Sequence, residues 1–302
     1  MHWITDHCRP ADARSFAFAL LVSMTTACGG GAGGGAPVSQ PAGGPQSPDP
    51  VPVPTPTSLH IDIDVLALVS DSVTEQYSDP TLRVNHLFAV SNDVLAAAGI
   101  DLRFNVVRIQ KVSYPDGPDA PTALDDLTFA RDPALAAVPA LRNSVHADLV
   151  VLIRPYANDG YCGYAWTAGV GTRGDFSDPA LPDYGYAVAA SDCSDYVLLH
   201  EFGHNLGLVH SRRETPNGGS FPYGAGYGRD NDFVTIMANP TQFNAVQLPV
   251  YSDPTRQCDG SACGMDHNDA VNGSDSVRAI TAASRTAGWL PSAASISPSS
   301  MR

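Results

Sequence analysis

Apolar and polar residues alternate along residues 100–109 and at the start of 59–69, which then becomes continuously apolar. Because side chains of a strand point alternately to its two faces, these patterns predict two β-strands, the earlier of which enters a core. A third segment, 147–154, is apolar almost throughout. Such a run predicts a strand that is covered on both faces and therefore lies near the centre of a sheet.

Between the first two strands, residues 79–99 carry apolar side chains at helical spacing. Asp79 is suited to cap this helix, Pro80 to stand at its first position and Gly99 to end it. Residues 125–143 show a weaker helical pattern that two prolines interrupt.

Two shorter strands are predicted at 161–167 and 184–190. A helix follows over 196–207, with Ser194 or Asp195 as its N-cap.

The rest of the chain is rich in glycine and proline up to an amphipathic helix at 275–288. Strands alternate with helices only in the first half. This order predicts an α/β (α+β) domain with a twisted mixed sheet and an irregular C-terminal subdomain.

The segment 28–58 consists largely of glycine, proline, serine and other small residues. It has too little apolar surface to offset its ordering entropy, so it is predicted to be a tether. The following stretch, 59–290, is long enough for one large domain with its own core. The last residues, 291–302, are predicted to be a disordered tail.

The first 27 residues have the features of an export signal. A short apolar run from Arg14 to Met24 is too short to span a bilayer and has the dimensions of a secretory h-region. Small residues before Cys28, and glycines after it, resemble a bacterial lipoprotein signal, in which Cys28 would be lipidated. The alternative is an ordinary cleaved leader. Both interpretations export the domain, either as an envelope lipoprotein at the outer membrane or cell surface or as a secreted protein.

Apart from Cys8 and Cys28 of the export signal, four cysteines remain, and an even number in an exported chain predicts two disulfides. The favoured pairing is Cys162 with Cys193 and Cys258 with Cys263, because the second pair closes a short local loop.

The net charge of −14 and the single lysine argue against binding of nucleic acid or anionic lipid. Membrane contact is expected only through the lipid anchor. The composition carries no information on the oligomeric state.

The segment His200–His210, HEFGHNLGLVH, contains the candidate metal-binding and catalytic residues. With about 3.6 residues per helical turn, His200 and His204 lie on one face and can bind one metal ion. Glu201 projects near the same place. A continued helix would rotate His210 by about 600° from His204, away from this face. Gly207 can adopt a positive φ and break the helix, which would bring His210 back to the ion.

These residues form the H-E-x-x-H-x-x-G-x-x-H signature, and the chain therefore resembles the metzincin zinc metallopeptidases. Met237 stands where that clan has its Met-turn. Asn205–Leu208 is similar to the reprolysin branch, and Tyr251–Pro254 is similar to a segment of bacterial reprolysin-like and peptidyl-Asp metallopeptidases, the closest resemblance. Two positions depart from the clan: Ser211 follows the third histidine where reprolysins carry Asp, and Asn239 stands where astacins and serralysins carry tyrosine.

The resemblance implies an endopeptidase with one zinc ion per chain, held by His200, His204 and His210. Glu201 would act as general base and then general acid for a zinc-activated water. Protein or peptide substrates would lie along an edge strand, for which 163–170 is the candidate.

An alternative function is a surface zinc-binding adhesion or scavenging lipoprotein on an inactive protease fold. Arg212 and Arg213 stand two and three residues after the predicted ligand His210, and they raise the hypothesis of a preference for acidic substrate side chains. Calcium is a weaker possibility, since the segment 266–269 has two aspartates without the spacing of an EF-hand.

Overall fold

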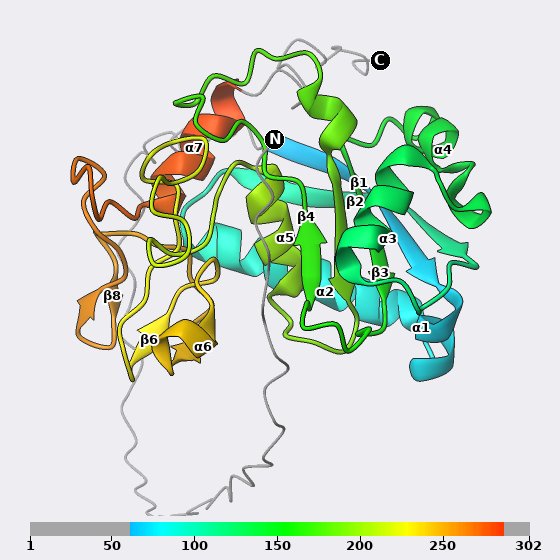
Figure 1. Ribbon diagram of the computed structural model, residues 1–302, viewed down its shortest axis with the longest axis horizontal. Coiled ribbons are helices and arrows are strands. Elements are labelled where there is room, and N and C mark those ends of the chain that lie inside the picture. The colour runs from blue at the N-terminus through cyan, green and yellow to red at the C-terminus, as the bar shows by residue number, and fades with distance from the viewer. Residues whose placement is uncertain (1–60, 287–302) are drawn as a thin grey trace, which may run out of the picture. The chain divides into compact units, whose positions relative to one another are not determined.

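The computed structural model describes residues 61–286 of the chain (Figure 1). The predicted leader with Cys28, the tether and the tail lie outside the described residues. Among the described residues, no helix is long and apolar enough to cross a membrane.

A mixed sheet of five strands organises the first half of the domain, in the order β2-β1-β3-β5-β4. Four strands run parallel to one another: β1 (Ile61–Ser70), β2 (Leu102–Val112), β3 (Leu149–Arg154) and β5 (Tyr186–Ala190). The edge strand β4 (Gly163–Ala165) runs antiparallel to β5. All residues of β3 are buried, and this strand lies at the centre of the sheet, as its apolar run predicted. The predicted fold class is confirmed.

Helices cover both faces of this sheet (Figure 1). One face carries α2 (Pro80–Ala97), α5 (Val197–Asn205) and α7 (Ser276–Thr286). The other carries α3 (Ala120–Phe129) and α4 (Val138–Ser144). The remaining helices are short: α1 (Asp71–Gln76), α6 (Pro240–Phe243) and two 3-10 turns, Pro133–Leu135 and Leu181–Tyr184.

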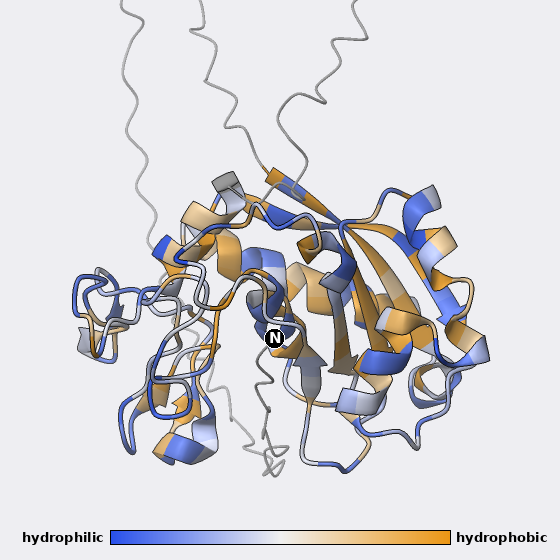
Figure 2. Cartoon of the chain, turned by 45° about the horizontal axis from the view of Figure 1, so that its top comes forward, coloured by the Kyte–Doolittle hydropathy of each residue, from blue (hydrophilic) through white to orange (hydrophobic). Residues whose placement is uncertain are grey.

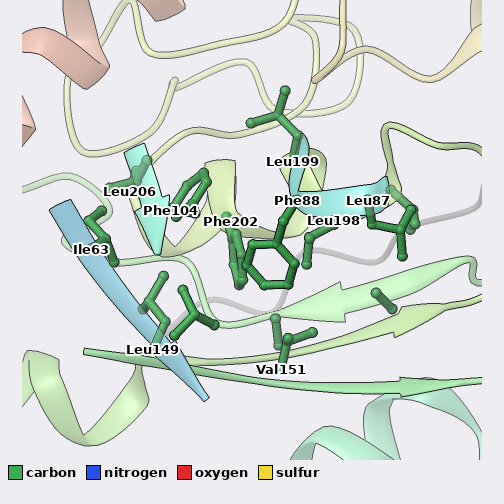
Figure 3. Packing of buried hydrophobic residues seen from close by; sticks show 14 of the residues in the cluster. Ile63, Leu87, Phe88, Phe104, Leu149, Val151, Leu198, Leu199, Phe202 and Leu206 are labelled. Atoms are coloured by element: carbon green, nitrogen blue, oxygen red, sulfur yellow. The ribbon is translucent and has the colours of Figure 1, made fainter. Parts of the chain in front are cut away.

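The first core cluster lies between the sheet and the pair α2 and α5 (Figure 3). Phe202 of α5 packs between Phe88 and Phe104, with ring centroids 6.1 and 4.6 Å away. Burying such side chains contributes about 1.5–3 kcal/mol each, so this contact fixes α5 against the sheet. Figure 2 shows apolar residues gathered along the strands and the packed helix faces, whereas the loops are mostly polar.

The ends of α2 are those that the sequence predicted. The Asp79 carboxylate accepts a hydrogen bond from the backbone N–H of Leu82, and Pro80 is the first helical residue. Gly99 follows the helix with φ of 69°, a left-handed conformation that glycine adopts without steric cost.

Two helix predictions were wrong in detail. Tyr196, not Ser194 or Asp195, is the N-cap of α5. Asp195 instead forms an ion pair with Arg83 of α2, and the Ser194 hydroxyl accepts a hydrogen bond from the N–H of Tyr196, one residue before the helix. The weak helical segment begins earlier, at Ala120, and consists of three pieces, because its prolines stand at the starts of the later ones.

The C-terminal half is irregular, as predicted, apart from α6, α7 and two small sheets, β6–β7 (Phe233–Val234, Val246–Gln247) and β8–β9 (Gln257–Cys258, Ser261–Ala262). The two disulfides join Cys162 to Cys193 and Cys258 to Cys263, the pairing that the sequence favoured. The first links the residue before β4 to the loop before α5, and so ties the edge strand to that helix.

Candidate metal centre

Helix α5 presents two histidines one turn apart. His200 and His204 are only 6% and 2% exposed, and their ring centroids lie 5.0 Å from each other. Leu198 and Phe202 bury the opposite side of the helix in the core (Figure 3). The helix can therefore not rotate without losing that packing, and both imidazoles are held in place.

The helix ends at a glycine turn that redirects the chain. The N–H of Gly207 bonds to the carbonyl of His204 at 2.8 Å, and the N–H of Leu208 bonds to that of Gly203 at 2.9 Å. With φ of 86° at Gly207, this is a Schellman motif. Val209 then bridges to Ala225, which fixes the direction of the chain beyond the turn.

The turn brings His210 to the two histidines of α5. Its ring centroid lies 5.2 Å from that of His200 and 5.0 Å from that of His204. One ring nitrogen from each of the three lies within 4.8 Å of the others. The structure thus assembles all three predicted ligands in one buried cluster.

Hydrogen bonds to backbone carbonyls set the protonation of two rings. His200 Nδ1 lies 2.7 Å from the carbonyl oxygen of Ile236, and His204 Nδ1 lies 2.9 Å from that of Leu208. A carbonyl oxygen can only accept, so each Nδ1 carries a proton, and in the neutral ring Nε2 is then the nitrogen with a lone pair. Neutral imidazoles with a fixed tautomer are the form in which histidine binds metals.

The cluster fits a small tetrahedral ion. Two nitrogens that each lie about 2.05 Å from a tetrahedral zinc ion are separated by about 3.3 Å. The Nε2 atoms of His200 and His210 are 3.2 Å apart. The Nδ1 of His210 lies 4.0 Å from Oε1 of Glu214. The partner of this ring is thus a carboxylate, whereas His200 and His204 have backbone carbonyls as partners.

Met237 lies beneath this cluster, fully buried. A Cβ atom added at Gly203 would come within 2.5 Å of its sulfur, so the methionine packs against the helix between the two histidines. The same turn supplies the Ile236 carbonyl to His200. Asn239 caps α6 by accepting from the N–H of Thr241, which explains the residue at the position where other metzincin branches carry tyrosine.

Glu201 is 1% exposed and lies against the edge strand. A Cβ atom at Gly163, the first residue of β4, would overlap the Glu201 carboxylate. Only glycine leaves room for this side chain, so β4 and the carboxylate are in direct contact. The candidate substrate strand at 163–170 thus begins beside the candidate base.

Arg212 and Arg213 have other partners. The Arg212 guanidinium donates to the carbonyl oxygens of Pro216, Pro222 and Gly273 and so ties three loop segments together. Arg213 forms an ion pair with Asp230 and stacks over Phe243. The geometry gives no support to the hypothesis that they select acidic side chains.

Three contributors to the site were not found from the sequence: the carbonyls of Ile236 and Leu208 and the carboxylate of Glu214. Gly163 was predicted only as the start of the substrate strand, without its contact with Glu201. Each has its role because of a contact made in the folded chain. Asn205 was noted only as part of the motif. Its side chain donates to the carbonyl oxygens of Trp166 and Tyr186, which joins the end of α5 to β5 and to the segment after β4.

Residues 69–269 match the family model described as metallo-peptidase family M12B, reprolysin-like. The match covers more than half of the 302 residues and contains the whole histidine cluster, Glu201 and Met237.

Two curated relatives match as well. Over 236 residues the chain is 29% identical to a peptidyl-Asp metalloendopeptidase of Pseudomonas aeruginosa, covering 70% of this chain and 38% of that protein. Over 178 residues it is 25% identical to a peptidyl-Asp metalloendopeptidase of Xanthomonas campestris pv. campestris, covering 58% of this chain and 40% of that protein. The chain thus spans about two fifths of the length of these relatives.

A solved structure described as a chaperone-substrate complex shares the fold. It aligns with a TM-score of 0.56 at 21% sequence identity and covers 76% of this chain and 35% of that chain.

Proposed function

Because the chain belongs to the reprolysin-like M12B family of metallopeptidases, we propose that it is a zinc endopeptidase that hydrolyses peptide bonds of proteins or peptides. The observation that supports this proposal most is the buried cluster of three imidazoles, together with the buried Glu201 on the helix that carries two of them. In this proposal His200, His204 and His210 hold one zinc ion through their Nε2 atoms. Such an ion, when bound, supplies a Lewis acid that polarises a carbonyl and acidifies water.

Glu201 performs the proton transfers. Its carboxylate accepts a proton from the attacking water and returns this proton to the leaving amine. Burial excludes bulk water, and the contact with Gly163 limits the positions that the carboxylate can adopt. Both features keep the base in one orientation, which general base catalysis requires.

The substrate is proposed to lie along β4 and its continuation, residues 163–170. This strand is at the edge of the sheet, with β5 on one side. An extended peptide could add to its other side through main-chain hydrogen bonds, as edge strands allow. Both curated relatives are named peptidyl-Asp metalloendopeptidases, and on this basis the proposal includes cleavage of peptide bonds beside aspartate.

Export is proposed from the leader and supported by the disulfides, which persist in oxidising compartments. We propose that Cys28 carries the lipid anchor, with residues 28–58 as the tether between this anchor and the peptidase domain.

The competing function is a zinc-binding adhesion or scavenging lipoprotein on an inactive protease fold. Such a protein would need the histidines but not a buried carboxylate beside them. The test compares Glu201→Gln with Glu75→Gln, a matched change at an exposed glutamate of α1. Both variants are expected to bind one zinc per chain by elemental analysis, and only Glu201→Gln loses casein cleavage, by about 10³-fold or more. Equal cleavage by both variants would exclude the proposed role of Glu201, and absence of chelator-sensitive cleavage by the parent would favour the adhesion protein.

A further inference from the structure

A cavity of about 280 Å³ lies next to the metal centre, under the loop that connects β4 and β5. Small-molecule sites commonly measure about 300–1,000 Å³, so this cavity suits a single side chain better than a cofactor. Its lining consists of Trp166, Thr167, Ala168, Gly169, Val170, Thr172, Asp175, Asp178, Leu181, Tyr184, Gly185 and Asn205.

Asn205, one of the lining residues, has a buried hydrogen-bond acceptor without a partner among the described residues. Asn205 is 2% exposed, and its Nδ2 already donates to the carbonyl oxygens of Trp166 and Tyr186. These two bonds fix the orientation of the amide, and its Oδ1 has no donor within the described part of the chain. A buried acceptor without a donor is unfavourable, so the site favours a ligand with an N–H group.

The charged lining residues are both acidic. Asp175 and Asp178 are exposed and form the rim of the cavity, and none of the lining residues is basic. Hydrogen bonds from Ser177 hold the pKa of Asp175 below its ordinary value, so this carboxylate is ionised at neutral pH. The rim therefore attracts cations and repels anions.

The walls between rim and amide are largely apolar. The ring of Trp166 meets that of Tyr184 edge to face, with centroids 5.3 Å apart. Together with Val170 and Leu181 they offer a surface for an aliphatic stem, while aromatic faces also attract a cation. A long side chain with an apolar stem and a cationic tip matches all three kinds of lining.

The cavity is preformed and joined to the metal centre. The N–H of Ala168 donates to the carbonyl of His204 at 3.1 Å, and Asn205 directly follows this histidine. On the other side of the loop, Gly171 and Gly174 donate to the carbonyls of Gly219 and Ser220 at 3.2 and 3.0 Å. The first half of the loop is thus fixed at three points before any ligand arrives.

From this geometry we propose that the cavity is a substrate subsite for the guanidinium or ammonium group of an arginine or lysine side chain. The inference rests on the proposed peptidase function. A peptide extended along β4 would pass Trp166–Val170, which both continue that strand and line the cavity. A basic residue a few positions from the cleaved bond would then enter it.

The first experiment uses the full chain and a set of quenched fluorescent peptides. Arginine is placed in turn at each position on both sides of the cleaved bond, and citrulline, its neutral isostere, replaces it in matched peptides. At one position on one side, the ratio of kcat/KM for arginine over citrulline is expected to be about fivefold or more. In Asp175→Asn/Asp178→Asn this ratio falls by about fivefold, because two exposed charge pairs contribute about 0.5 kcal/mol each. Asp183→Asn, an exposed aspartate of the same loop that does not line the cavity, keeps the parent ratio.

A second measurement does not depend on proteolysis. Binding of agmatine to the full-length Glu201→Gln protein is followed by saturation-transfer NMR, with and without the two Asp→Asn changes. Binding that these changes weaken supports the cation site, even if the parent cleaves no peptide and the proposed peptidase function fails. Cleavage without any arginine preference, together with no agmatine binding, would overturn the subsite while leaving the peptidase intact. In that case the cavity would not bind a basic substrate side chain.

Discussion

The contact between the edge strand and the candidate base gives the sharpest prediction, the effect of Gly163→Ala. A Cβ atom at this position would lie 2.6 Å from Cδ and 2.7 Å from Cγ of Glu201. Carbon atoms in favourable contact are about 3.5–4.0 Å apart, so the Glu201 side chain must move by about 1 Å. Gly163 is held by the ladder to β5 and by the disulfide at Cys162, so β4 itself has little freedom to withdraw.

A shift of about 1 Å in a catalytic group can reduce the rate about 10²-fold, which corresponds to about 2.7 kcal/mol in the activation free energy. We expect Gly163→Ala to lower kcat/KM by this factor. None of the three histidines lies on β4, and the carbonyls behind His200 and His204 and the Glu214 carboxylate behind His210 stay in place, so zinc content is expected to remain one per chain. Added volume in a packed region also costs about 1–3 kcal/mol in the free energy of unfolding.

The assay measures kcat/KM on one peptide substrate, zinc by elemental analysis and unfolding in urea. The control is Gly117→Ala, because a Cβ at Gly117 meets no atom within 4 Å and this glycine has no positive φ. If Gly163→Ala is folded and keeps kcat/KM within about threefold of the control, the inferred position of Glu201 against β4 is wrong.

Three further predictions concern stability and the metal. Removing the Cys162–Cys193 disulfide, with a sequence separation of 31, should lower the free energy of unfolding by about 3.7 kcal/mol. Removing Cys258–Cys263, with a separation of 5, should lower it by about 2 kcal/mol. Guanidinium titrations of the two double Cys→Ala variants measure both losses, and equal losses would contradict the loop-entropy argument. Burial raises the pKa of Asp148 to about 6, and its carboxylate accepts the N–H of Asp64. Between about pH 4 and 6 the folded protein therefore binds more protons than the unfolded chain, so the free energy of unfolding falls as pH rises through this window. Asp148→Asn should remove that slope in urea titrations across this range, and an unchanged slope would assign it to other groups. Gly207→Ala places a side chain at φ of 86°, which costs about 1–2 kcal/mol, and against the Ser220 hydroxyl. Zinc affinity, measured by titration with a competing chelator, should therefore fall about tenfold or more. An affinity equal to that of the parent would show that the turn does not position His210.

Much of the fold follows from local patterns in the sequence. The central strand β3 was predicted because its apolar run extends over both faces, and α2 because a cap, a proline and a glycine mark its ends. The candidate metal ligands were predicted for the same reason, since HEFGHNLGLVH contains the two helical positions, the glycine and the third histidine within eleven residues. Helical geometry and the freedom of glycine are properties of the local chain.

The start of α5 shows where local patterns fail. Ser194 and Asp195 are both good N-caps by residue type, but Arg83 of α2 takes the Asp195 carboxylate, and the helix begins after Tyr196. A charge on another helix, more than one hundred residues away, outweighs the local preference for a cap, which is worth about 1 kcal/mol.

Within this protein, the sequence by itself determined which residues can bind a metal and which of them can share a helix face. Only the tertiary structure decided what surrounds them: the carbonyls of Ile236 and Leu208 that set two tautomers, Gly163 against Glu201, and the cavity beside Asn205. The periodicity of apolar residues in the sequence indicates which face of a helix or strand packs against the core. It does not report which distant backbone atom or side chain completes a polar site, because those contacts depend on how strands and loops from separate parts of the chain pack together.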